Sequence, residues 1–122
     1  MLNIKSESWI SMIRIEIRKK SKRIVYFEIK GHADFKEYGQ DIICSAVSAV
    51  AQMTLNGLLE VLKLKNLKYT EKEGYIFCDL EKSELSNEEY DKADILTEAM
   101  FSYLQEVSKI YEKYVNLKIR EV

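Results

Sequence analysis

Alternation of apolar and polar residues predicts a β-hairpin near the start of the chain. Over residues 13–18 every second residue is isoleucine and the residues between are charged, as in a strand with one buried and one solvated face. The same alternation returns over residues 25–30, after a polar turn at 19–23. Residues 12–30 are therefore predicted to form a hairpin.

A helical pattern follows a polar loop at residues 31–40. Asp41 is a residue type that commonly caps helices, and the predicted helix runs on to about residue 62. Two apolar stripes share it: Ile43, Val47, Val50, Thr54 and Leu58 form the first, and Ile42, Ala46, Ala49 and Met53 the second. A helix that is apolar on two sides packs against two partners. We therefore expect the second stripe to form the contact surface of a homodimer.

The rest of the chain repeats this order of elements. Residues 66–70 and 75–82 indicate a second hairpin, and Ser86 with Glu89 has the form of a capping box at the start of a second helix. Alternation after Tyr114 is weak, which leaves an added edge strand open. The predicted fold is an α+β two-layer sandwich: a mainly antiparallel four-stranded sheet with both helices on one face.

Length and charge restrict the function classes. A chain of 122 residues and 14.3 kDa fits one domain, predicted over 12–122, with residues 1–11 as a flexible N-terminal extension. The formal charge of −1 creates no overall field toward nucleic acid, so no direct nucleic-acid binding is expected. We interpret the basic cluster at 19–23 as a solvated turn. No run of ~18 consecutive apolar residues indicates a membrane span.

Cysteine and histidine supply the candidate chemistry. Cys44 follows Asp41 by three residues and should lie in the first helical turn, where unpaired amides and the helix dipole lower a thiol pKa. His32 is the only histidine, and its ordinary pKa near neutrality suits a general base. Asp41 either caps the helix or orients His32. By itself Cys44 also fits a buried core position, which is how we interpret Cys78.

The segment from Gly31 to Ser48 resembles the signature of the ribosomal-processing cysteine proteases (Prp). The matching residues are Gly31-His32-Ala33, Gly39, Asp41-Ile42-Ile43-Cys44 and Ser48. The resemblance implies that His32 and Cys44 form a catalytic dyad, with Gly31, Gly39, Asp41 and Ser48 in supporting positions. It also implies the same fold, a tendency to dimerise, and removal of an N-terminal extension from large ribosomal subunit protein twenty-seven. The family more often has valine at Ile43 and alanine at Ser45.

The expected function is that of a cysteine endopeptidase. Its partner is the precursor of large ribosomal subunit protein twenty-seven, and its substrate contacts are Phe35 and Tyr38, the only large side chains of the loop. The alternative is a non-catalytic interaction module of the same fold, and a thiol-redox or acyl-transfer protein is a weaker third hypothesis. Two cysteines 34 residues apart and one histidine indicate neither a metal nor another cofactor, and they favour a reducing cytoplasm.

Overall fold

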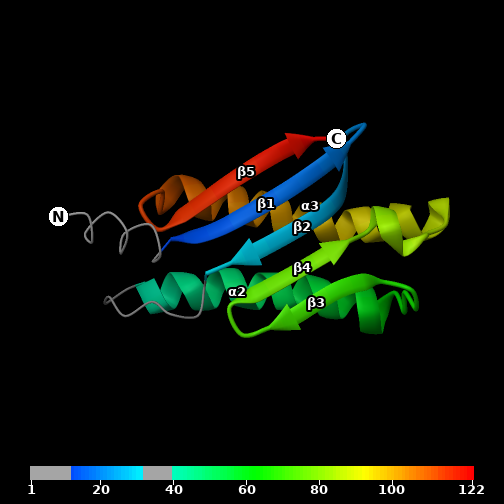
Figure 1. Cartoon of the computed structure of the whole chain (residues 1–122), viewed down its shortest axis with the longest axis horizontal. Helices are drawn as coiled ribbons and strands as arrows, with labels where there is room; N and C mark the ends of the chain where they lie inside the picture. Colours follow the sequence, from blue (N-terminus) through cyan, green and yellow to red (C-terminus); the bar gives the residue numbers. More distant parts are fainter. Residues whose placement is uncertain (1–11, 32–39) are drawn as a thin grey trace.

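The computed structural model describes residues 12–31 and 40–122 and places them in two layers, a five-stranded sheet and a pair of helices. Both helices cover the same face of the sheet, and the opposite face is left open (Figure 1). The predicted α+β sandwich with both helices on one face is thus confirmed, while the number and direction of the strands differ from the prediction.

The first hairpin is confirmed. β1 (Ile13–Lys20) and β2 (Arg23–Lys30) pair antiparallel, with Ile15 opposite Ile29 and Ile17 opposite Phe27 on the face that the helices cover. The turn is tighter than the predicted five residues. It consists of Ser21 and Lys22, both with positive φ (51° and 69°), as a two-residue turn that matches the right-handed twist of the strands requires.

The first helix places its first apolar stripe in the core. α2 (Gln40–Asn56) continues into a π-helical turn, η1 (Gly57–Val61). Four of the five stripe residues are buried and Val50 packs against the core. The second stripe faces away from it, since Ile42 is 70% and Met53 66% exposed. Residues 42–61 are long and apolar enough to cross a membrane, but their buried side forms the core between the sheet and α2.

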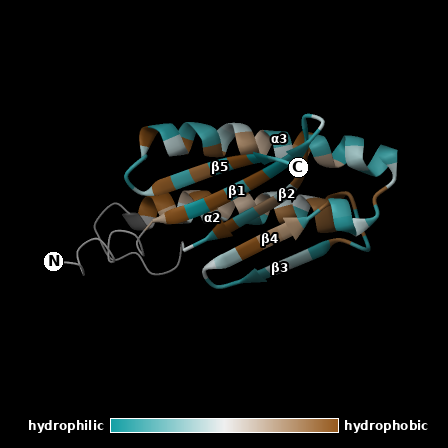
Figure 2. Cartoon of the chain, turned by 45° about the horizontal axis from the view of Figure 1, so that its top comes forward, coloured by the Kyte–Doolittle hydropathy of each residue, from teal (hydrophilic) through white to brown (hydrophobic). Residues whose placement is uncertain are grey.

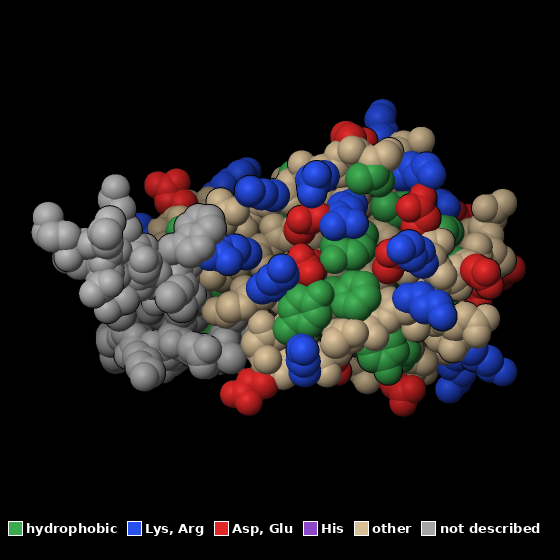
Figure 3. Space-filling model, viewed as in Figure 1, with side chains coloured by type: hydrophobic (Ala, Val, Ile, Leu, Met, Phe, Trp, Pro, Cys, Tyr) green, Lys and Arg blue, Asp and Glu red, His purple; other side chains and the backbone are tan. Residues whose placement is uncertain are grey.

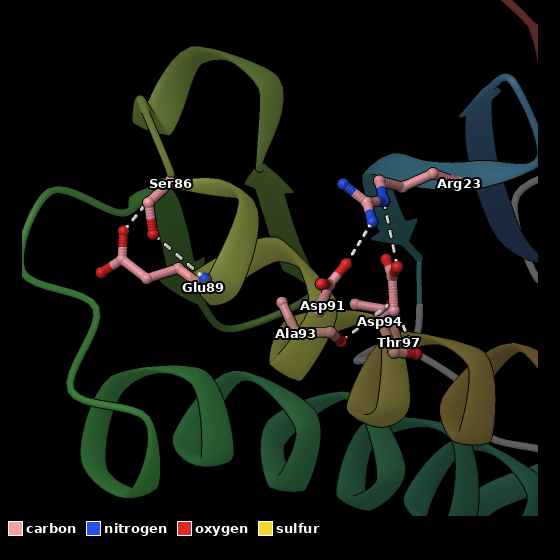
Figure 4. A network of polar contacts seen from close by, with 7 residues as sticks. All are labelled: Arg23, Ser86, Glu89, Asp91, Ala93, Asp94 and Thr97. Atoms are coloured by element: carbon pink, nitrogen blue, oxygen red, sulfur yellow. Dashed lines mark hydrogen bonds and ion pairs between the residues drawn. The ribbon is translucent and has the colours of Figure 1, made fainter.

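The second hairpin and the second helix also form where the sequence predicts. β3 (Lys68–Lys72) and β4 (Tyr75–Asp79) are followed by a short 3₁₀ turn, η2 (Glu81–Ser83), and by α3 (Asn87–Ile110). The capping box is confirmed (Figure 4). The Glu89 amide donates to Ser86 Oγ (3.1 Å), and the Ser86 amide donates to Glu89 Oε1 (2.9 Å). These bonds satisfy two amides that the helix start would otherwise leave unpaired.

An arginine joins the start of β2 to the first turns of α3. Arg23 Nη2 contacts Asp91 Oδ1 at 2.6 Å, and Arg23 Nε contacts Asp94 Oδ2 at 3.0 Å (Figure 4). Its guanidinium also lies 4.8 Å from the centre of the Tyr90 ring. The two carboxylates lie near the helix N-terminus, where the helix dipole favours negative charge. These ion pairs tie the N-terminal part of α3 to the start of β2.

The chain ends in a fifth strand, which corrects the predicted four-stranded antiparallel sheet. β5 (Val115–Glu121) pairs parallel to β1, so the sheet is mixed, with the order β3-β4-β2-β1-β5. Its alternation is weak because burial fades along it: Val115 is buried, Leu117 is half-buried and Ile119 is 47% exposed. Where both faces of a strand are exposed to solvent, apolar and polar residues need not alternate along it.

The two faces of the sheet differ in chemistry. Apolar side chains on the covered face meet those of α2 and α3 in one core, and the strands alternate in hydropathy along their length (Figure 2). We call the other side the open face (Figure 3). The strand register gives it three aromatic residues (Tyr26, Tyr75 and Phe77), three acidic residues (Glu16, Glu28 and Asp79) and seven basic residues (Arg14, Arg18, Lys30, Lys68, Lys72, Lys118 and Arg120).

Candidate active site

The candidate site lies where β2 ends and α2 begins. β2 gives way at Gly31, whose amide donates to the Gly74 carbonyl in the β3–β4 turn (3.1 Å). Gly31 has a φ of +84°, and a Cβ there would lie 2.9 Å from the Met12 carbonyl oxygen. Any other residue would be strained in this conformation and would clash with the backbone. Glycine at this position therefore fixes the direction in which the chain leaves the sheet toward residue 32.

Replacing Gly31 with alanine is expected to lower the free energy of unfolding by about 2–4 kcal/mol. The left-handed conformation costs an alanine roughly 1–2 kcal/mol, and the backbone contact with Met12 adds to that because a carbonyl cannot turn aside as a side chain can. Urea unfolding followed by circular dichroism measures the change. Peptide cleavage should fall too, because the loop that carries His32 starts at this residue.

Gly57→Ala is the matched control for this prediction. A Cβ at Gly57 would lie 2.8 Å from Leu96 Cδ1, which is the end of a flexible side chain, and alanine is the better helix former. We expect a change in unfolding free energy below about 1 kcal/mol and unchanged cleavage. If Gly31→Ala and Gly57→Ala lowered the free energy of unfolding equally, the positive φ and the close Met12 carbonyl at Gly31 would not be what makes the alanine unfavourable there.

The start of α2 corrects two details of the sequence analysis. The helix begins at Gln40, so Asp41 is its second residue and not its N-cap. Cys44 is then the fifth residue, just past the first turn. A helix leaves only its first four amides without intrahelical partners, and these end before Cys44. Oxyanion donors are therefore expected from the amides that precede Cys44, in place of its own. Capping propensity is a preference of residue type that allows several neighbouring start positions, so Asp41 did not fix the first residue of the helix.

The two cysteines lie in different environments, and neither is in a disulfide. Cys44 is half-buried and packs against the edge of the core. Cys78 is fully buried on β4, which confirms its predicted core role. Burial there, with a smaller contribution from neighbouring Asp79, raises the pKa of the Cys78 thiol to about 12. A thiol that is buried and protonated is a poor nucleophile, so the structure leaves Cys44 as the candidate.

Ser48 lies one helical turn after Cys44 and is half-buried. Its Oγ accepts a hydrogen bond from Gln52 Nε2 at 3.3 Å. Ser45, beside the thiol in sequence, is exposed. Ser48 is thus held by the residue that follows it on the same helical face, and its hydroxyl lies on the side of α2 that carries Cys44.

Several predicted site residues lie outside the described residues. These are His32, Phe35, Tyr38 and Gly39, together with the side chain of Asp41. Three assignments therefore stay predictions: the dyad of His32 and Cys44, the orientation of His32 by Asp41, and the substrate contacts of the two aromatic loop residues. Within residues 12–31 and 40–122, no group of three or more His, Cys, Asp or Glu side chains is arranged to hold a metal ion.

The sequence analysis missed a groove beside the helix. An open hollow of about 450 Å³ lies between α2, η1 and β3, and its lining includes Met53, Leu55, Leu59 and Glu71. It also includes Ala49, which lies five residues after Cys44 and so about 7.5 Å further along the helix axis. A local signal for one of its walls was the second apolar stripe, which contributes Ala49 and Met53.

Comparison with known proteins gives consistent results. The family model described as cysteine protease Prp matches residues 12–116. A Bacillus subtilis (strain 168) protein named ribosomal processing cysteine protease Prp is 34% identical over 110 residues, which cover 88% of this chain and 96% of that protein. A crystal structure from Streptococcus mutans superposes with a TM-score of 0.79 at 30% identity, covering 92% of this chain and 97% of that one.

A second solved structure shares the fold at lower identity. It is the ribosomal processing protease Prp from Staphylococcus aureus in complex with a substrate peptide. It superposes with a TM-score of 0.73 at 22% identity, covering 89% of this chain and all of that chain. The five-stranded mixed sheet with two helices is therefore an arrangement that other proteins of this kind share.

Proposed function

The chain belongs to the cysteine protease Prp family and is a cysteine protease, and from that premise we propose that it removes the N-terminal extension of large ribosomal subunit protein twenty-seven. Cys44 is the proposed nucleophile and His32 its base. The observation that carries this assignment is the contrast between the two thiols: Cys78 is fully buried with a raised pKa, and Cys44 is half-buried near the start of α2. Family membership favours this function over a non-catalytic binding module.

The proposed reaction has two steps. In the first, His32 accepts the Cys44 proton, the Sγ attacks the scissile carbonyl carbon, and His32 returns the proton to the leaving amine as the C–N bond breaks. Amides at the start of α2, before Cys44, stabilise the oxyanion. In the second, His32 deprotonates a water molecule, which attacks the thioester, and the thiol leaves with a proton. The atoms balance as one peptide bond and one water molecule giving a carboxylate and a protonated amine.

The resemblance to Prp proteases implies apolar and aromatic substrate residues before the cut. The groove between α2 and β3 shares Ala49 and Met53 with the second stripe, which is the proposed dimer contact, so the substrate contacts are assigned to the loop. Phe35 and Tyr38 are the proposed contacts from the loop. A ribosomal substrate and two cysteines outside any disulfide suit the cytoplasm, where we place the reaction.

The direct test is cleavage of the organism's own precursor. The full-length chain is incubated with the precursor of large ribosomal subunit protein twenty-seven, and the products are identified by mass spectrometry. We expect one new N-terminus, preceded in the precursor by apolar or aromatic residues. A precursor whose extension has been replaced by a polar sequence of the same length is the matched substrate control. Saturable binding without any new N-terminus would contradict the proposal.

We further propose that the chain forms a homodimer through the second stripe of α2. The structure leaves Ile42 and Met53 largely exposed, so α3 does not cover this side of the helix. Light scattering at tens of micromolar is expected to report about twice 14.3 kDa. Met53→Glu should shift the protein toward monomer, whereas Ile95→Glu places the same charge at an exposed apolar residue of α3 and should not. A wild-type monomer would contradict the assignment.

A further inference from the structure

The strand register separates the charges of this protein. Seven of its 19 basic residues and only three of its 20 acidic residues lie on the open face. The rest of the chain is left with 12 basic and 17 acidic residues. A whole-chain charge of −1 therefore conceals a basic face and an acidic remainder. Local potential, and not net charge, decides which partners a surface attracts.

The acidic residues of the open face are already satisfied by neighbours. Glu16 pairs with Arg18 and, at 3.8 Å, with Arg120. Glu28 accepts a hydrogen bond from the Tyr75 hydroxyl at 2.7 Å and lies 3.8 Å from the Lys30 ammonium.

Asp79, the third acidic residue, accepts a hydrogen bond from the Lys82 amide at 3.0 Å. Three lysines of the open face make no ion pair within residues 12–31 and 40–122: Lys68 and Lys72 on β3 and Lys118 on β5. The excess positive charge thus lies along the two edge strands.

A row of aromatic rings crosses the middle of this face. The Tyr26 and Phe77 ring centroids are 5.8 Å apart, and those of Phe77 and Tyr75 are 6.1 Å apart. Cations lie against both ends of the row: the Arg18 guanidinium is 3.9 Å from the Tyr26 centroid, and Lys72 Nζ is 5.7 Å from that of Tyr75. Figure 3 shows hydrophobic side chains near the centre of this face, with lysine and arginine side chains and a few acidic ones around them.

A hollow adjoins the aromatic row over β1, β2 and β5. Its volume is about 270 Å³, and its polar lining consists of Arg14, Lys30, Asn116 and Lys118 together with Glu16 and Glu28, two carboxylates that already pair with groups of the protein. Basic side chains and an amide are the groups that contact phosphate and sugar oxygens in nucleic-acid complexes. Tyr26 is only 9% exposed and lies beneath Arg18, so the half-buried Phe77 and Tyr75 are the rings of this face that are left for stacking. Cations for phosphates lie beside them on the same sheet.

We propose that the open face binds single-stranded RNA, an activity separate from proteolysis. Aromatic side chains on central strands of a sheet are a common platform on which unpaired bases stack, and flanking cations bind the backbone. An acidic peptide would use the cations but not the rings. A second copy of this chain would bring two basic faces together, which like-charge repulsion opposes. Cys44 belongs to the helix layer on the other side of the sheet, so RNA and substrate do not compete for one surface.

The test uses the full-length protein and a fluorescein-labelled uridine decamer, with binding followed by anisotropy between 50 and 200 mM salt. We expect saturable binding that weakens with salt at a log–log slope of about −2 to −3, since four net positive charges each contribute roughly −0.7. Lys72→Glu with Lys118→Glu should weaken binding at least tenfold and flatten the slope by at least about 1.4. Lys65→Glu with Lys109→Glu changes the net charge equally but off the open face, and should change binding less than twofold.

Stacking is tested separately from charge. Phe77→Leu keeps an apolar side chain but removes the ring, and should weaken binding about tenfold with an unchanged salt slope. Phe77→Tyr should restore it. Thermal unfolding and precursor cleavage, measured on every variant, should stay near wild type.

Three results would overturn the proposal. They are no saturable binding at 50 mM salt, equal losses for the two lysine pairs, and competition by oligoglutamate as strong as by unlabelled RNA. The last would assign the face to an acidic peptide instead. The RNA result and the cleavage result are independent, so either can fail alone.

Discussion

Cys44→Ala is expected to abolish precursor cleavage, with a loss of at least about 10⁴-fold, because no other side chain can replace the attacking sulfur. His32→Ala should lose roughly 10²–10⁴-fold, since it removes the group that accepts and returns the proton. The Cys44→Ala protein should keep an unfolding midpoint close to that of wild type, because Cys44 is only half-buried where it packs against the core. The measurement is the rate at which the new N-terminus forms, followed by mass spectrometry.

Cys78→Ser is the matched control for Cys44→Ala. Its thiol is fully buried on β4 and contributes packing, so its loss should lower stability by about 1–3 kcal/mol and leave turnover of the folded protein largely intact. Cleavage by the Cys44→Ala protein at the wild-type rate would contradict the assigned nucleophile. If Cys78→Ser loses activity only in proportion to the protein that is unfolded, that result is compatible with Cys44 as the nucleophile.

Alkylation is expected to separate the two thiols by at least about 100-fold in rate. The Cys78 thiol has a pKa of about 12, so at pH 7 only about one molecule in 10⁵ carries the reactive thiolate. It is also shielded from reagent, being 0% exposed. Cys44 is partly accessible at the start of α2. Iodoacetamide labelling, quenched at intervals and read by peptide mass spectrometry, measures both rates in one sample.

Unfolding supplies the control for the alkylation rates. In concentrated urea the burial that raises the Cys78 pKa is gone, so the two cysteines should react at similar rates. Because the folded-state pKa of Cys78 is raised, its labelling in the folded protein should stay slow across pH 6–9. Equal rates in the folded state would show that Cys78 is not protected as the structure has it.

Local patterns predicted the elements of the fold. The alternation in residues 13–30, the Ser86–Glu89 capping box and the buried stripe of α2 each reflect contacts made within a few residues along the chain. Such contacts depend on nearby sequence alone. The predicted four-stranded antiparallel sheet was wrong, and the edge strand after Tyr114, which the sequence left open, depends on a neighbour distant in sequence. β5 exists through its pairing with β1, about 100 residues earlier.

The candidate site shows the same division. The candidate site residues between Gly31 and Ser48 could be picked out from the sequence. The reason that residue 31 must be glycine could not, because the Met12 carbonyl that would clash with a Cβ comes close only in the folded chain. Cys78 was assigned to the core from strand alternation, and burial on β4 confirmed it. The groove beside α2 could not be predicted, because β3 forms one of its walls and lies in a separate hairpin.

By itself, the sequence determined the types of element, the inward faces of the first hairpin and of α2, and the candidate nucleophile, because periodicity and residue chemistry are local properties. Only the tertiary structure decided the strand order, the parallel pairing of β5 and the charge of the open face. Its seven basic residues come from four strands spread over residues 14–120. They form one surface only when hydrogen bonds between strands set the register, since register fixes which side chains share a face.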